Sequence, residues 1–264
     1  MLTLFRRRKP PIVHGMEPAR AEVPALTGAE IAAIFYGQRM GGDYYDFLRV
    51  NGGRVLFVLL DVAGRHDETC EILCAAQETF RTSGAELFRE EDINEADAMI
   101  ELCVRLNLSI IKAASGVRSC PGFIGCYNEA LGTVCYANAG HTPGLLRDAS
   151  GVTLLPATGL PLGLFSHATS EAQIAALQPG AALLIVSRGI VDASCKGEEF
   201  GLGRVKESLQ QIQLGSALEL SSGILAKVQE YICAPPTHDD VTALSLLRAK
   251  PPLPSRTEFY GRLL

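Results

Sequence analysis

The sequence predicts an α+β domain in which antiparallel sheets pack against pairs of helices. Short apolar runs separated by turn residues indicate strands that follow one another along the chain. Longer stretches with apolar residues at three- or four-residue steps indicate helices between the groups of strands. Strands joined by short turns favour antiparallel pairing, and helices that come in pairs are expected to cover the sheets. The 264 residues are enough for one large domain or two small ones.

Each element follows from its local pattern. The first two strands are expected at 41–50 and 55–62, joined by the turn Asn51-Gly52-Gly53. Helices follow at about 67–82 and 93–115, the second with Asp92 or Asn94 as its cap. Strands are then expected at 123–130, 131–140, 144–148, 152–156 and 182–187. Helices at about 198–213 and 216–232 and a strand at 241–248 complete the domain, which we place at 29–248 between flexible tails at 1–28 and 249–264.

Composition narrows the class of protein. Hydrophobic residues make up 47% of the chain and charged residues 20%, as in folded globular proteins. A net charge of −5 argues against a general nucleic-acid binder, which needs a basic face. We expect no membrane-spanning segment, because no apolar run approaches ~18 residues. We also expect no signal peptide, because no apolar h-region follows the basic start MLTLFRRRKPP. The eight cysteines form no C-x-x-C pair, so we expect reduced thiols and a cytoplasmic protein.

Carboxylates recur at the ends of predicted strands. Asp43 and Asp46 lie in GGDYYDF, Asp61 ends VLFVLLD, and Asp239 and Asp240 precede VTALSLLR. Brought together they would repel one another unless a cation held them. Oxygen ligands without a Cys/His pair at zinc spacing favour magnesium or manganese. The alternative is that these aspartates form turns and caps.

Other residues suggest rival sites. His66, Cys70 and Cys74 fall on one helical face and could hold a soft metal, although the two cysteines also suit the buried stripe of that helix. His141 lies in a predicted turn, where a histidine bonded to the backbone is the simpler interpretation. His238 precedes the Asp239-Asp240 pair and is a candidate neighbour of a metal-bound water.

The motifs GGDYYDF, LLDVAG, YANAGHTPGLLR, GLPLGLF, EEFG and HDDVTALSLLR occur in this order over residues of about 30 to 248. Together they resemble the SpoIIE-type serine phosphatases of the PPM (type 2C) superfamily. The resemblance implies a four-layer α–β–β–α sandwich with two central antiparallel sheets. It also implies two magnesium or manganese ions that activate a water to attack phosphoserine or phosphothreonine.

Ligand roles follow from the resemblance. It implies that Asp61 bridges both metals, that the backbone carbonyl of Val62 is a neighbouring ligand, and that Asp239 binds the first metal. Asp240 would lie beside Asp239, Asp43 close by through water, and Asp46 further out.

Two positions depart from the family pattern. Where the family has Thr-Asp-Gly with a metal-ligand aspartate, this chain has Ser187-Arg188-Gly189, so Arg188 either points away or takes the place of the metal. After Asp61 the family continues Gly-Lys-Gly, whereas here Arg65 stands in a bulkier loop, either as a phosphate contact or as a solvated side chain.

The resulting hypothesis is a metal-dependent protein serine/threonine phosphatase in which Asp61, Asp239 and Arg188 are catalytic and Arg65 and Arg188 bind phosphate. Similar proteins act on phosphoserine of small anti-sigma-factor antagonists. We also expect a separate regulatory protein, and a homodimer is compatible with the sequence. The alternative is a pseudophosphatase that serves as a protein-binding module, because Arg188 replaces an expected ligand.

Overall fold

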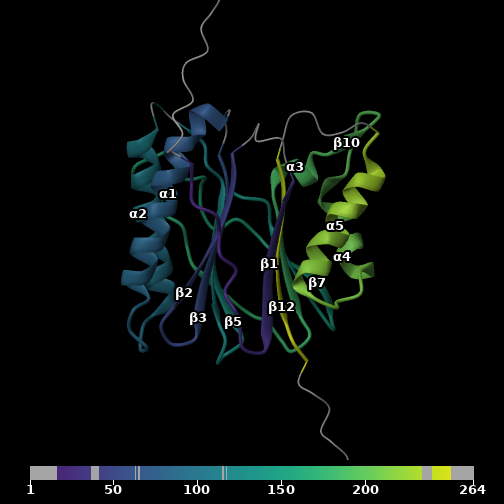
Figure 1. The fold of residues 1–264 in the computed structure, drawn as a ribbon, viewed down its shortest axis with the longest axis horizontal. Coiled ribbons are helices and arrows are strands. Elements are labelled where there is room, and N and C mark those ends of the chain that lie inside the picture. The colour runs from purple at the N-terminus through teal and green to yellow at the C-terminus, as the bar shows by residue number, and fades with distance from the viewer. Residues whose placement is uncertain are drawn as a thin grey trace, which may run out of the picture.

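The computed structural model describes residues 17–36, 42–62, 64, 66–114, 116, 118–233 and 240–250. Two five-stranded sheets lie face to face, with a pair of helices over the outer face of each (Figure 1). Helices α1 (His66–Leu87) and α2 (Glu95–Ala113) cover one sheet, and α4 (Gly201–Gln211) and α5 (Ala217–Tyr231) cover the other. The predicted four-layer α–β–β–α sandwich is therefore confirmed.

The first sheet has the order β2-β3-β4-β5-β8, and all its pairs are antiparallel. Its strands are β2 (Asp43–Val50), β3 (Arg54–Asp61), β4 (Gly122–Asn128), β5 (Thr133–Ala139) and β8 (Gln173–Ala176). Along β3 the side chains alternate: Leu56, Val58 and Leu60 pack toward α1 and α2, while Phe57 and Leu59 pack between the sheets.

The second sheet has the order β1-β12-β9-β6-β7 and is also antiparallel. Its strands are β1 (Ala29–Tyr36), β12 (Val241–Arg248), β9 (Ala182–Val186), β6 (Gly144–Asp148) and β7 (Gly151–Leu155). The sequence did not predict β1 or β8. The segment AEIAAIFY is rich in alanine, which has a weak preference for strands, and β8 is a short, largely exposed edge strand.

Three short elements connect β9 to the second helix pair. They are α3 (Arg188–Val191), β10 (Ser194–Cys195) and β11 (Glu198–Glu199). Because Glu198–Glu199 pairs with Ser194–Cys195, α4 begins at Gly201 and not at the predicted residue 198. Helix α2 begins after Asn94, whose side-chain oxygen accepts from the backbone nitrogens of Ala96 and Asp97 at 3.1 and 3.4 Å.

Part of the segment assigned to the N-terminal tail contacts the domain. The backbone of Ala19 exchanges two hydrogen bonds with the side chain of Gln77 in α1, and the Thr27 nitrogen donates to Glu129. Within the part of the chain that the structure describes, no helix combines the length and the apolar character needed to cross a bilayer.

The prediction that all cysteines are reduced is wrong for one pair. Cys195 of β10 and Cys233, just beyond α5, form a disulfide with their Cα atoms 5.0 Å apart. Their separation of 38 residues gave no sign of pairing, because the fold alone brings β10 to the end of α5. Four of the other cysteines are buried, and Cys70 and Cys74 are half-buried.

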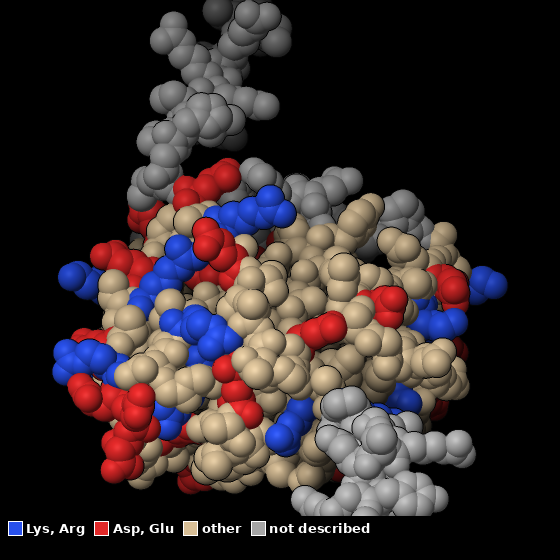
Figure 2. All heavy atoms as spheres, turned by 60° about the horizontal axis from the view of Figure 1, so that its bottom comes forward, with Lys and Arg blue, Asp and Glu red and all other residues tan. Residues whose placement is uncertain are grey.

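Acidic and basic side chains are mixed on the face of the molecule shown in Figure 2, with no large patch of either sign. On the helices of the first layer, for example, Arg105 of α2 pairs with Glu86 of α1 and with Glu101. Such exposed pairs contribute little to stability, typically about 0.2–1 kcal/mol each.

Candidate active site

Two carboxylates of the first sheet face each other at one end of the gap between the sheets. Asp43 begins β2, Asp61 ends β3, and the two residues are direct partners in the antiparallel register. Side chains alternate along a strand, so Asp43 lies on the same face as Phe47, and Asp61 on the same face as Phe57. Both phenylalanines pack between the sheets, which places the two carboxylates on that side.

The second sheet contributes the opposite wall. Asp240, immediately before β12, is buried with 5% of its surface exposed. The Thr242 hydroxyl donates to Asp43 Oδ2 at 2.6 Å and so joins the two sheets. Ser187 follows β9, and its Oγ accepts from the Thr242 backbone nitrogen at 2.9 Å. Sequence reasoning missed Thr242 and Ser187 as site residues, although their position beside the expected ligands was a usable signal.

The electrostatics of this group disfavour its negative charges. Burial raises the pKa of Asp43 well above its ordinary value, and the neighbouring charges of Asp61 and Asp240 raise it further. Hydrogen bonds from Thr242 and Ser187 act in the opposite direction. A cation in this gap would neutralise the repulsion.

The donor chemistry fits magnesium or manganese, because Asp43, Asp61 and Asp240 all offer carboxylate oxygens. Within the described ranges, no three His, Cys, Asp or Glu side chains form a complete metal-holding group. The predicted ligand Asp239 lies outside the described residues, as do Arg65 and His238.

The backbone around Val62, the other predicted ligand, is closely packed. Val62 is buried, and its nitrogen donates to the Gly42 carbonyl at 3.1 Å. A Cβ atom added at Gly42 would lie 2.1 Å from the Val62 carbonyl oxygen. Glycine is therefore required at position 42 for the backbone to pass this carbonyl.

Arg188 is the first residue of α3, and its side chain is 73% exposed. Its Nε donates to Asp192 Oδ2 at 2.7 Å. Its neighbour Ser187 contributes a side-chain hydrogen bond that lowers the pKa of Asp43. The structure thus brings Ser187 to Asp43, while the exposed Arg188 side chain pairs with Asp192.

The expectation that Asp46 lies in the outer part of the site is wrong. Asp46 points to the opposite face of β2 from Asp43, toward α1, and is fully buried. It accepts from Arg81 Nε at 2.7 Å and Arg81 Nη2 at 3.1 Å, and from the Tyr44 hydroxyl at 2.8 Å. The three-residue step from Asp43 reverses the face of the strand, so Asp46 anchors the helix layer instead.

His141 lies in the turn after β5 and is bonded to the backbone, as expected. Its backbone nitrogen donates to Asn138 Oδ1 at 2.8 Å, and its Nδ1 lies 3.2 Å from the Thr142 carbonyl. Burial lowers the pKa of the imidazole to about 4, so the ring is neutral at pH 7. In the alternative candidate site for a soft metal, Cys70 and Cys74 are half-buried, and burial raises the pKa of both thiols. The side chain of His66, the third residue of that site, lies outside the part of the chain that the structure describes.

Comparison with known proteins places the chain in a family. The model of the Stage II sporulation protein E (SpoIIE) family matches residues 51–249. Phosphoserine phosphatase RsbP of Bacillus subtilis is 25% identical over 159 residues, which are 59% of this chain and 38% of RsbP. The chain spans about two fifths of the length of the curated relatives it matches.

Solved structures share the fold at low sequence identity. The RsbU and RsbW domains of Rv1364c from Mycobacterium tuberculosis align with a TM-score of 0.71 and 24% identity, over 88% of this chain and 64% of that one. RsbX in complex with magnesium aligns with a TM-score of 0.60 and 15% identity, over 86% of this chain and 99% of that one. The family model covers most of the domain. The chain therefore belongs to the SpoIIE family.

Proposed function

We propose that this chain is a metal-dependent protein phosphatase that hydrolyses phosphoserine or phosphothreonine on a bacterial signalling protein. The observation that carries the proposal is the cross-strand pair Asp43 and Asp61 facing Asp240 across the gap between the sheets. Membership of the SpoIIE family and the similarity to a phosphoserine phosphatase support it.

In this proposal Asp61, the Val62 carbonyl and Asp239 are ligands of magnesium or manganese, with Asp43 and Asp240 beside them. When bound, the metal supplies Lewis-acid chemistry, which activates water for attack on the phosphoryl group and neutralises its charge. The RsbX structure, which contains magnesium, supports this choice of cofactor.

The residues of this chain hold the carboxylates in position. The Thr242 hydroxyl donates to Oδ2 of Asp43 and so fixes the orientation of this carboxylate. Ser187 in turn holds the backbone of Thr242. These hydrogen bonds favour the ionised form of Asp43, which is the form that a cation requires. Gly42 leaves room for the Val62 carbonyl, because a Cβ at this position would lie 2.1 Å from its oxygen.

We assign Arg188, and Arg65 with it, to the binding of substrate phosphate. The exposed guanidinium of Arg188 can meet a phosphorylated protein at the surface, and arginine matches phosphate oxygens in a bidentate geometry. The second candidate function is a pseudophosphatase that binds a phosphorylated or regulatory protein without hydrolysis. The observation that favours it is the arginine at a position where the family supplies a ligand.

The proposed substrate is a small anti-sigma-factor antagonist carrying phosphoserine, and the proposed setting is the cytoplasm. We also propose that a separate protein regulates this activity. Formation of a homodimer is a second route for a regulatory signal.

The test is hydrolysis of a phosphoserine peptide by the purified chain, with and without manganese. Asp61→Ala is expected to lower the rate at least about a hundredfold, because the bridging carboxylate is lost. Arg188→Asp separates the two candidates: reduced activity supports phosphate binding, and activity gained from an inert wild type supports the pseudophosphatase. Arg89→Asp is the matched control, because Arg89 is 76% exposed and lies in the loop between α1 and α2. An active Asp61→Ala variant would contradict the proposal.

A further inference from the structure

The disulfide lies where solutes can reach it. Cys195 is half-buried and Cys233 is exposed, whereas four of the six other cysteines are buried. The burial of those four raises their thiol pKa values, to about 12 for Cys103, which keeps them protonated and unreactive. Cys233 is therefore the one exposed cysteine among the described residues, while Cys195 shares the half-buried state of Cys70 and Cys74.

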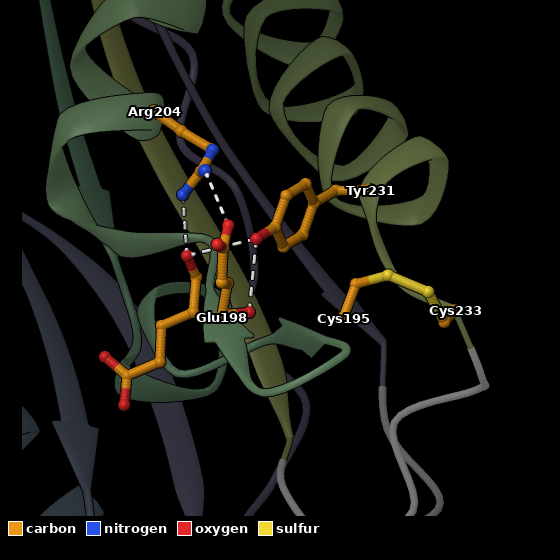
Figure 3. Close-up of a disulfide and its surroundings, with 6 residues drawn as sticks. Cys195, Glu198, Arg204, Tyr231 and Cys233 are labelled. Carbon is orange, nitrogen blue, oxygen red and sulfur yellow. Dashed lines mark hydrogen bonds and ion pairs between the residues drawn. A yellow bond between two sulfur atoms is a disulfide. The ribbon is translucent and has the colours of Figure 1, made fainter.

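Noncovalent contacts hold the two ends of the disulfide together independently of the bond. The Tyr231 hydroxyl at the end of α5 lies 3.1 and 3.3 Å from the carbonyl oxygens of Glu198 and Glu199 in β11 (Figure 3). The Arg204 guanidinium lies 4.8 Å from the centre of the Tyr231 ring, and Phe200 meets this ring edge-on at 5.3 Å. Because these contacts do not involve sulfur, reduction would leave the two thiols close to each other. A preorganised dithiol of this kind re-forms its bond readily.

The disulfide is also close in sequence to both segments that the second sheet contributes to the candidate site. Cys195 follows Arg188 by seven residues, through α3. Cys233 precedes Asp240 by seven residues. The bond thus closes a covalent ring that contains α4 and α5. The chain leads from Ser187, at the end of β9, to Cys195 and from Cys233 to Asp240, just before β12.

We propose that Cys195 and Cys233 form a reversible redox modification site, and that its oxidation state sets the stability of the α4–α5 layer and the affinity of the neighbouring acidic group for metal. The coupling to metal rests on the proposed function, and the redox site itself does not. Exposed disulfides are typically the labile and regulatory ones, which agrees with an accessible and preorganised pair.

The oxidant is a small-molecule disulfide such as oxidised glutathione. The thiolate of the exposed Cys233 attacks one glutathione sulfur, forms a mixed disulfide and releases one glutathione thiolate. The Cys195 thiolate then attacks the Cys233 sulfur and releases the second glutathione. The protein dithiol loses two electrons, the glutathione disulfide gains them, and the two thiol protons end on the two glutathione molecules.

The test begins with the full chain equilibrated in reduced and oxidised glutathione, followed by alkylation of free thiols and peptide mapping. We expect a Cys195–Cys233 cross-linked peptide under oxidising conditions and its loss in dithiothreitol. The melting temperature is expected to fall by about 8 °C on reduction. Cys195→Ser should melt at the lower temperature in both buffers, while the control Cys74→Ser should keep the shift. Absence of the linked peptide, or a shift that persists in Cys195→Ser, overturns the redox site.

Calorimetric titration of manganese into the oxidised and reduced chain tests the coupling without using activity. We expect at least threefold weaker binding after reduction, and no such difference for Cys195→Ser. Equal affinities, or no binding in either state, overturn the coupling. Failure of the proposed function is distinguishable from failure of the coupling. In that case cross-linking and metal binding would be normal, but the phosphopeptide would not be hydrolysed.

Discussion

Asp43 and Asp46 lie three residues apart on one strand, and we predict that replacing each by asparagine changes stability in opposite directions. Both substitutions remove one charge and leave the side-chain volume nearly unchanged. Asp46→Asn should destabilise the metal-free protein, and Asp43→Asn should stabilise it. The difference arises because the strand turns the two carboxylates to opposite faces.

The magnitude for Asp46 follows from its contacts. Its carboxylate is fully buried and accepts two hydrogen bonds from Arg81 and one each from Tyr44, Gln77 and the Phe47 nitrogen. Removing one partner of a buried ion pair costs about 3–5 kcal/mol. The Arg81 side chain is 35% exposed and can rehydrate in part, so we expect the lower end, about 3 kcal/mol. This corresponds to a melting temperature lower by about 6–12 °C.

For Asp43 the sign reverses. Burial and the charges of Asp61 and Asp240 raise its pKa, so the ionised side chain destabilises the folded, metal-free state. A neutral amide removes this repulsion and can still accept from Thr242. Like charges directly opposite each other on neighbouring strands cost up to about 1 kcal/mol, which is the expected gain.

The assay is urea unfolding of both variants at pH 7 in the presence of a chelator, with phosphopeptide hydrolysis measured separately in manganese. Asp46→Asn should retain activity within about threefold at a temperature where it is folded, because Arg81 and Tyr44 lie on the helix side of the strand. A loss below about 1 kcal/mol for Asp46→Asn, or an equal destabilisation by Asp43→Asn, would refute the reasoning from the two faces.

Three other substitutions test separate features. Burial lowers the folded-state pKa of His141 from 6.5 to about 4, so the contribution of His141 to the free energy of unfolding should fall by about 3 kcal/mol between pH 7 and pH 4, and His141→Gln should flatten that slope in urea titrations. Gly125→Ala would place a Cβ 2.2 Å from the Phe57 ring, so calorimetry should show a loss of about 1–3 kcal/mol; an unchanged melting temperature would argue against this packing. Gly42→Ala displaces the Val62 carbonyl, and hydrolysis should fall at least about tenfold; wild-type kinetics would show that the carbonyl has no role.

The sequence was sufficient for the fold wherever the local signal was strong. The β2–β3 hairpin followed from two apolar runs around Asn51-Gly52-Gly53, and Asn94 was one of the two candidate caps, with Asp92, before an amphipathic stretch. The strands β1 and β8 escaped because their strand character depends on the partners β12 and β5, which lie far away in the sequence. The disulfide escaped for the same reason, since tertiary packing alone brings its two cysteines together.

The candidate site was only partly predictable. Asp43 and Asp61 could be paired because one short hairpin joins their strands. The contributions of Ser187 and Thr242 depend on how the two sheets face each other, which no local pattern contains. Asp46 was misplaced because a motif was treated as a unit, although adjacent residues on a strand point to opposite faces.

The hydrogen bond from Thr242 to Asp43 joins residues of different sheets, so the geometry of the candidate site depends on the spacing between the sheets. That spacing is set by the side chains packed between them, among them the stacked rings of Phe123 and Tyr136. Mutational tolerance should therefore differ between the three hydrophobic layers. Variants that repack the two helix-facing layers can keep their activity at reduced stability, whereas volume changes between the sheets should alter activity before they alter folding.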